Sequence, residues 1–387
     1  MKNIALLSNR TGNIGHIFMA FGMEEIAREA FGPDVAITHY EQHCFFDIYP
    51  FWHPLRLTHL VRHGWLKSLR EMLSTEKACR YFWPRAHAIS RHHLAVACGG
   101  PSASPCVSAS PEMKLMFLHQ MGAFPFHGVP ALNIGVGSGA FPIEQLPGKE
   151  YPCFTAGDTS YFARMFAVTA QTTARDPFAQ KLFAELGHDV PLIPCAAIAV
   201  GRYFQKNEAV SAPGAKYIFI NFQKYGANED WGQKVDPEAW QATVRNLIGR
   251  LRPRHEVAFL CHNKLERILA EKVDATVPRF FPQTPEEYGQ VIRQAKAGLV
   301  SRIHAAIPLA GIGIPSIVIG TDTRLGSVEQ IGLQTHYVKN ATADVLEAGL
   351  EQLLSRSEEE KNRLLAVRDA TIRQYAAILR SFARSGD

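Results

Sequence analysis

The sequence predicts an α/β protein of two domains, each with a mostly parallel sheet, which face each other across a cleft and are followed by C-terminal helices. Short apolar runs, which are typical of buried strands, alternate along the chain with segments of helical spacing. This alternation restarts at 217–221, after a segment at 201–215 that carries Gly, Asn, Ser and Pro. The length of 387 residues also exceeds that of one ordinary domain.

We expect an N-terminal domain over 1–200, a C-terminal domain over 215–340 and C-terminal helices over 341–387. The order strand, loop, helix, strand at the start of the chain is typical of a Rossmann-like unit. Strands are expected at 4–7, 35–40, 94–98, 131–139, 166–170, 217–221, 257–261, 279–281, 299–300 and 316–320. Helices are expected at 17–30, 177–186, 237–251, 264–273, 286–296 and 305–311, with two more within 343–383, the second having Ser357 as its N-cap.

Composition and charge exclude several classes of protein. Hydrophobic residues make up 47% of the chain, and the net charge of +5 comes without the block of Lys and Arg that marks a nucleic-acid surface. The seven cysteines form no C-x-x-C pair, and the histidines lack metal-site spacing. No run of about 18 apolar residues predicts a membrane span, and the first apolar run is too short for a signal peptide. We therefore expect a cytoplasmic protein with no metal, cofactor or nucleic-acid partner; peripheral association with the inner membrane face and the oligomeric state stay open.

Arg302 and His304 stand between a predicted strand ending at Val300 and a predicted helix. Ligands of open α/β sheets bind outside the carboxyl ends of strands, and a helix N-terminus there attracts anions. An Arg can hold a phosphate or carboxylate through two hydrogen bonds, and a His can move a proton near neutral pH. The pair predicts chemistry on a small anionic substrate. The alternative is a buried His beside an Arg–carboxylate pair.

Other polar turns follow predicted strands. The turn at 11–16 has glycines that let the backbone approach an anion, or that only form a tight βα turn. Arg175 precedes a helix, either as a second anion ligand or as the partner of Asp176. The loop at 320–326 could hold a phosphate or a sugar hydroxyl, or be a turn capped by its Asp. Cys261 and His262 are neighbours on a strand and point to opposite faces, which disfavours a thiol nucleophile.

Taken together, these motifs resemble the polysaccharide pyruvyl transferase family over most of the chain, to about Leu333. The resemblance rests on the order and spacing of Asn13-x-Gly15, Gly99-Gly100, the glycine turn at 135–139, Arg175-Asp176 with a helix ending in Leu186-Gly187, and Arg302-x-His304 followed by Gly313-x-Pro315. The sequence departs from the family at His16, where an acidic residue is usual, and at 194–197. The segment 41–95, rich in His, Trp, Phe and Arg, matches no family element and leaves the acceptor open.

The resemblance implies a GT-B-like fold, with the acceptor on the N-terminal domain and the donor on the C-terminal domain. Such enzymes move a pyruvyl group from phosphoenolpyruvate onto two hydroxyls of a sugar in a surface polysaccharide or exopolysaccharide, and the acceptor is a glycan or a nucleotide- or lipid-linked sugar. The implied donor ligands are Arg175, Arg302 and His304 with Gly12, Asn13 and Gly15 of the early turn. In the implied reaction, His304 is the acid or base and Arg302 stabilises the departing phosphate. Further candidates for a base or for binding the acceptor are His16, Asp158, Asp322 and Arg324.

Two alternatives remain open from the sequence. The first is a GT-B glycosyltransferase that uses a nucleotide sugar, in which Arg302 and Arg324 would hold a diphosphate. The second is a sugar-binding protein without catalytic activity.

Overall fold

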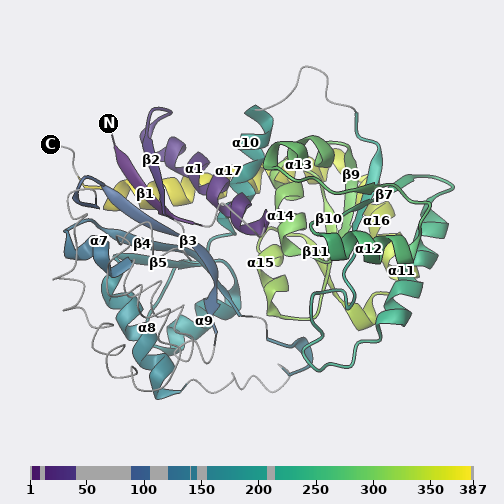
Figure 1. Cartoon of the computed structure of the whole chain (residues 1–387), viewed down its shortest axis with the longest axis horizontal. Helices are drawn as coiled ribbons and strands as arrows, with labels where there is room; N and C mark the ends of the chain where they lie inside the picture. Colours follow the sequence, from purple (N-terminus) through teal and green to yellow (C-terminus); the bar gives the residue numbers. More distant parts are fainter. Residues whose placement is uncertain are drawn as a thin grey trace.

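Two α/β domains lie side by side in the computed structural model, each built on its own parallel sheet (Figure 1). The structure describes residues 2–8, 14–40, 89–104, 121–139, 141–145, 155–206 and 214–384. Both sheets are parallel at every described strand pair, so the predicted fold class is confirmed.

The N-terminal sheet has five strands in the order β2-β1-β3-β4-β5. These are β1 (Asn3–Leu7), β2 (Ala36–Tyr40), β3 (Leu94–Ala103), β4 (Ala131–Ser138) and β5 (Gln171–Ala174). Successive residues of a strand face opposite sides of a sheet, and β1 follows this rule. Its Ala5 and Leu7 pack with α7 (Gly122–Phe126), α8 (Ala156–Val168) and α9 (Pro177–Glu185), whereas Ile4 and Leu6 pack with α1 (Ile14–Phe31). Helices therefore cover both faces, as a parallel sheet requires.

The C-terminal sheet has six strands in the order β11-β10-β9-β6-β7-β8. These are β6 (Tyr217–Asn221), β7 (Glu256–Leu260), β8 (Arg279–Phe280), β9 (Ala295–Val300), β10 (Ser316–Gly320) and β11 (Gln334–Tyr337). One face packs against α11 (Pro237–Leu251), α12 (Lys264–Val273) and α16 (Ala343–Ser355). The other packs against α10 (Val200–Lys206), α13 (Pro285–Ile292), α14 (Ile303–Gly311) and α15 (Gly326–Glu329).

Local signals in the sequence explain where several helices begin. Asp236 and Asn263 accept hydrogen bonds from backbone N–H groups in the first turns of α11 and α12, and both helices have the bounds predicted from the sequence. Pro237 occupies the first position of α11, where its missing N–H costs nothing.

Three secondary-structure predictions need correction, and one strand was missed. The strand expected at 166–170 is wrong, because α8 continues to Val168 and β5 begins only at Gln171. The helix expected at 286–296 ends at Ile292, since the alternation of buried Ala295, exposed Lys296 and buried Ala297 begins strand β9 there. Strand β11 was not predicted. Ser357 is not an N-cap: it is the first helical residue of α17 (Ser357–Phe382), and no side chain caps that helix.

The last helix, α17, joins both domains. Its Leu364 belongs to the core of the C-terminal domain, whereas Ile372, Tyr375 and Leu379 complete the core of the N-terminal domain. The Tyr375 hydroxyl donates a hydrogen bond to the carbonyl of Pro194 at 3.0 Å. In the described part of the chain, no helix is both long and apolar enough to cross a lipid bilayer.

Candidate functional site

A pocket lies between the two domains, at the carboxyl ends of strands from both sheets. Six of the residues singled out in the sequence contribute to its lining: His16, Arg175, Arg302, His304, Asp322 and Arg324. The first two come from the N-terminal domain and the others from the C-terminal domain. Gly12 and Asn13 lie outside the described residues. A parallel sheet gathers its strand ends at one edge, which is why residues far apart in the chain meet here.

Arg175 is the most unusual group of the pocket. Its side chain is fully buried, with a relative exposure of 2%, directly after β5. Nη1 lies 3.7 Å from the sulfurs of Met19 and Cys195, and Nε has no hydrogen-bond partner among the described residues. The neighbouring Asp176 is engaged elsewhere, because it accepts hydrogen bonds from the backbone N–H groups of Ser138 and Ala179 at 2.8 Å. A buried cation without a carboxylate is costly, so this geometry favours an anionic ligand.

Gly137 makes room for Arg175. A Cβ atom at this glycine would lie 2.4 Å from Nε of Arg175. The glycine at this position near the end of β4 is therefore explained by the guanidinium that packs against it.

Arg302 also lines the pocket, but a carboxylate holds it. Its Nε donates to Glu266, which is 3% exposed, and its Nη2 lies 3.4 Å from Oδ1 of Asn228. Glu266 also accepts hydrogen bonds from the Asn221 side chain at 2.9 Å and from the His262 backbone N–H at 2.8 Å. The Arg–carboxylate pair considered from the sequence is thus present, and it holds Arg302 at the pocket rather than away from it.

His304 lies in the first turn of α14 and is partly buried. Its Nε2 has no partner among the described residues, and a Cβ at Gly15 would lie only 2.1 Å from its Nδ1. Burial, followed by the positive charges of Arg175, His16 and Arg302, holds the pKa of His304 well below its ordinary value. The imidazole is therefore neutral at neutral pH and can accept a proton. Gly15, expected to approach the donor, instead makes room for this ring.

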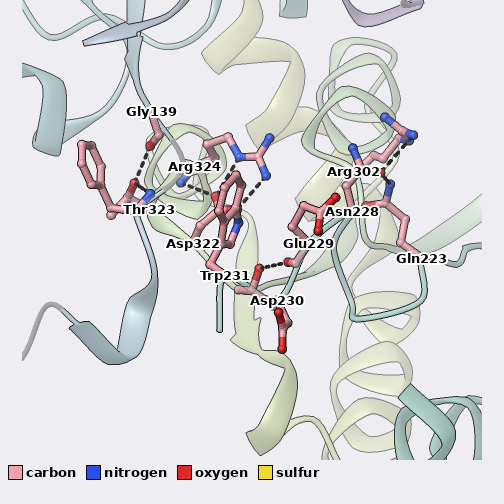
Figure 2. A network of polar contacts seen from close by, with 12 residues as sticks. Gly139, Gln223, Asn228, Glu229, Asp230, Trp231, Arg302, Asp322, Thr323 and Arg324 are labelled. Atoms are coloured by element: carbon pink, nitrogen blue, oxygen red, sulfur yellow. Dashed lines mark hydrogen bonds and ion pairs between the residues drawn. The ribbon is translucent and has the colours of Figure 1, made fainter. Parts of the chain in front are cut away.

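Asp322 serves as an anchor for Arg324. Its carboxylate receives Nε of Arg324 at 2.8 Å and Nη2 at 2.6 Å, and the Trp231 indole at 3.2 Å (Figure 2). With its oxygens occupied in this way, it is poorly suited to the base or acceptor role expected from the sequence.

Asp158 has no place in the pocket lining. It forms a reciprocal capping box with Thr155 at the start of α8, and this structural role replaces the role expected from the sequence.

Burial raises the pKa of the Cys261 thiol to about 12, so this cysteine is protonated at neutral pH.

Glu266 and Trp231 were not predicted from the sequence. Glu266 stands three residues after Asn263, a spacing that signals a helix start and nothing more. Trp231 is a single aromatic residue in a polar loop, a weak signal. Among the described residues, no group of three or more His, Cys, Asp and Glu side chains is placed to hold a metal ion.

Changing Glu266 to Gln is expected to lower the free energy of unfolding by about 3 kcal/mol, because the buried Arg302 pair loses its negative partner. Binding of inorganic phosphate, the probe for the expected anionic ligand, should weaken as well, since Arg302 is no longer held in place. Urea denaturation and phosphate titration measure the two effects. Glu271→Gln is the matched control: it lies on the same helix, its side chain is 60% exposed, and it should change stability by less than about 0.5 kcal/mol. Equal effects of the two substitutions would contradict the role given to Glu266.

Stability is expected to fall as the pH drops from about 6.5 towards 4. Burial lowers the pKa values of His92 and His262 to about 4, and that of His304 is also depressed. Below about pH 6.5 the unfolded chain therefore binds more protons than the folded chain, and folding loses free energy. Urea midpoints between pH 7.5 and 4.5 measure this dependence, and His304→Asn should flatten part of it. A constant midpoint over this range would contradict the depressed pKa values.

Comparison with known proteins supports the fold. No family model and no curated protein matches the sequence. Among solved structures, the complex of MnaA from S. aureus with UDP matches over 100% of both chains, with 12% identity and a TM-score of 0.53. The UDP-GlcNAc 2-epimerase from Neisseria meningitidis, bound to UDP-GlcNAc, matches over 99% of both chains, with 10% identity and a TM-score of 0.54. Together with the two facing parallel sheets, these similarities identify the GT-B fold.

Proposed function

We propose that this protein is a transferase that takes a group from a phosphate-bearing donor in the interdomain pocket and places it on a sugar hydroxyl. The observation that carries this proposal is Arg175, a buried guanidinium that lines the pocket and has no carboxylate partner among the described residues. Such a cation gains most from an anion that enters the pocket.

We place a nucleotide sugar first among the donor classes. Solved structures that share the fold over their whole length hold UDP or UDP-GlcNAc. Arg302 and Arg324 follow two adjacent strands, β9 and β10, and α14 begins between them. Two guanidinium groups and a helix N-terminus suit a diphosphate.

In this scheme the neutral His304 accepts the proton of the acceptor hydroxyl as the oxygen attacks the anomeric carbon. The bond from that carbon to the phosphate oxygen breaks, and the nucleoside diphosphate leaves with the electron pair. Arg175 and Arg302 stabilise the charge that grows on the departing phosphate. General base catalysis of this kind contributes about 10²–10⁴-fold to the rate.

The second candidate donor is phosphoenolpyruvate. It is favoured by the resemblance in sequence and by cationic groups that enter the pocket from both domains, Arg175 from one and Arg302 from the other. These could hold the carboxylate and the phosphate of one small molecule. Here a sugar hydroxyl adds to C2 while C3 gains a proton. Inorganic phosphate then leaves, and a second hydroxyl completes the ketal.

Released products separate the two donors. We would incubate the enzyme with a panel of UDP-sugars or with phosphoenolpyruvate, each with a panel of sugar acceptors, and follow phosphorus by NMR. Nucleoside diphosphate is the expected product, whereas inorganic phosphate from phosphoenolpyruvate establishes the second candidate. The cognate donor should raise the free energy of unfolding by about 2.7 kcal/mol at 100-fold excess over its dissociation constant. If no phosphate-bearing compound stabilises the protein, the proposal fails.

A further inference from the structure

Trp231 stands on a strained loop after β6, and its indole contacts Asp322, a residue of the pocket lining. Its side chain is 40% exposed, an unusual state for so large an aromatic residue. Its backbone φ is 54°, in the left-handed region that bulky residues rarely adopt. Strained backbone of this kind persists where the surroundings impose it, often at ligand sites.

The surroundings do impose it here. The Gln233 side chain donates to the carbonyls of Thr321 at 2.8 Å and Asp230 at 2.9 Å, and it accepts from the Glu144 backbone N–H at 3.0 Å. The Thr321 hydroxyl donates to the Glu229 carbonyl at 3.0 Å. These bonds tie the loop to the end of β10 and to the N-terminal domain. The Trp231 ring is therefore held in place before any ligand arrives, which lowers the entropic cost of binding.

The indole edge is fixed as well. Its Nε1 donates to Asp322, which also forms an ion pair with the pocket-lining Arg324 (Figure 2). The polar edge of the ring is thus satisfied by a pocket-lining residue, while the residue as a whole stays 40% exposed.

The charges beside Trp231 select the class of ligand. Glu229 is exposed and Asp230 half-buried, so two carboxylates precede the ring directly in the chain. They would repel a phosphate but can accept hydrogen bonds from hydroxyl groups. Arg324 does not offset them fully, because Asp322 already pairs with it.

We propose that Trp231, with Glu229, forms a subsite for a neutral sugar ring, which stacks its C–H face on the indole while the carboxylate accepts from its hydroxyls. This deepens the proposed function, because the sugar is then the acceptor, held next to the cationic pocket that takes the donor. It also adds to acceptor recognition on the C-terminal domain, where Asp322 and Arg324 were candidates from the sequence, whereas the family resemblance implies an acceptor on the N-terminal domain.

Indole N–H signals test the subsite directly. The chain has five tryptophans, and Trp231→Phe identifies the Trp231 cross-peak in a ¹⁵N correlation spectrum by its loss. Methyl glycosides of neutral hexoses should shift this cross-peak in a saturable way, both with and without inorganic phosphate present. The proposal is overturned if phosphate moves the peak and glycosides do not, or if neither does.

Kinetics give a second measure once an acceptor is known. Trp231→Ala should raise the acceptor KM about tenfold, as expected for the loss of one aromatic contact, and leave the donor KM within about twofold. Trp231→Phe should recover most of the loss. Phe126→Ala, at a side chain of similar exposure (41%) on α7, is the control and should change neither constant. A rise in the donor KM alone would overturn the assignment.

The two proposals can fail separately. If UDP-sugars or phosphoenolpyruvate stabilise the protein while glycosides leave the Trp231 signal unchanged, the subsite is wrong and the transferase stands. If glycosides shift the signal while no phosphate-bearing compound binds, the subsite stands and the transferase is wrong.

Discussion

Replacing Arg175 by methionine should stabilise the unliganded protein while it removes the capacity to bind a phosphate-bearing donor. The guanidinium is 2% exposed, with sulfur atoms of Met19 and Cys195 beside it. A methionine fills a similar space without a buried charge, so the free energy of unfolding should rise by about 1–3 kcal/mol. Without Arg175, the bound donor loses its buried cationic partner, so kcat/KM should fall about 10²–10³-fold.

Arg175→Lys separates charge from geometry. Lysine keeps the positive charge but lacks the planar fork, so donor binding should recover only in part. Thermal unfolding without ligand and donor titration measure the two sides of the prediction. A methionine variant that is less stable than the parent and still binds donor would show that Arg175 is a structural residue.

Gly15→Ala should cut turnover strongly by displacing His304, the general base of the proposed function, which belongs to the other domain. The added Cβ would lie 2.1 Å from Nδ1 and 2.3 Å from Cγ of His304, far inside contact distance. The imidazole must then leave its position beside Arg175, and turnover should fall about 10²-fold or more, as in His304→Ala.

Gly249→Ala is the matched control, because this glycine is also helical and a Cβ there meets nothing within 4 Å. It should keep full activity and gain up to about 1 kcal/mol from helix propensity. The double variant Gly15→Ala/His304→Ala should regain the stability lost by Gly15→Ala without regaining turnover. An active Gly15→Ala enzyme would remove His304 from the mechanism.

Elements with strong local signals could be predicted from the sequence. The capped helix at 264–273 and the apolar strand at 316–320 were placed correctly because their signals lie within the segment. The rule that parallel strands end at one edge of a sheet also explains why Arg302 and His304 line the pocket together with Arg175.

What could not be predicted depends on the order of strands in space. β6 lies between β9 and β7, so Asn221 at its end can reach Glu266, which follows β7, while Glu266 holds Arg302, which follows β9. The sequence gives these residues, but it does not show which strands lie next to one another in the sheet. The contact between Gly15 and His304 could not be predicted either, because the difference between their residue numbers is 289.

The helix that crosses from one lobe to the other has a consequence for biosynthesis. The apolar face of β1 that holds Ile4 and Leu6 is covered in part by Ile372, Tyr375 and Leu379, which are synthesised long after it. During translation, this apolar surface of the amino-terminal lobe therefore stays exposed to solvent until α17 has left the ribosome. A chain that ends before residue 364 would lack part of the hydrophobic core of both lobes, and such fragments should aggregate rather than stay folded.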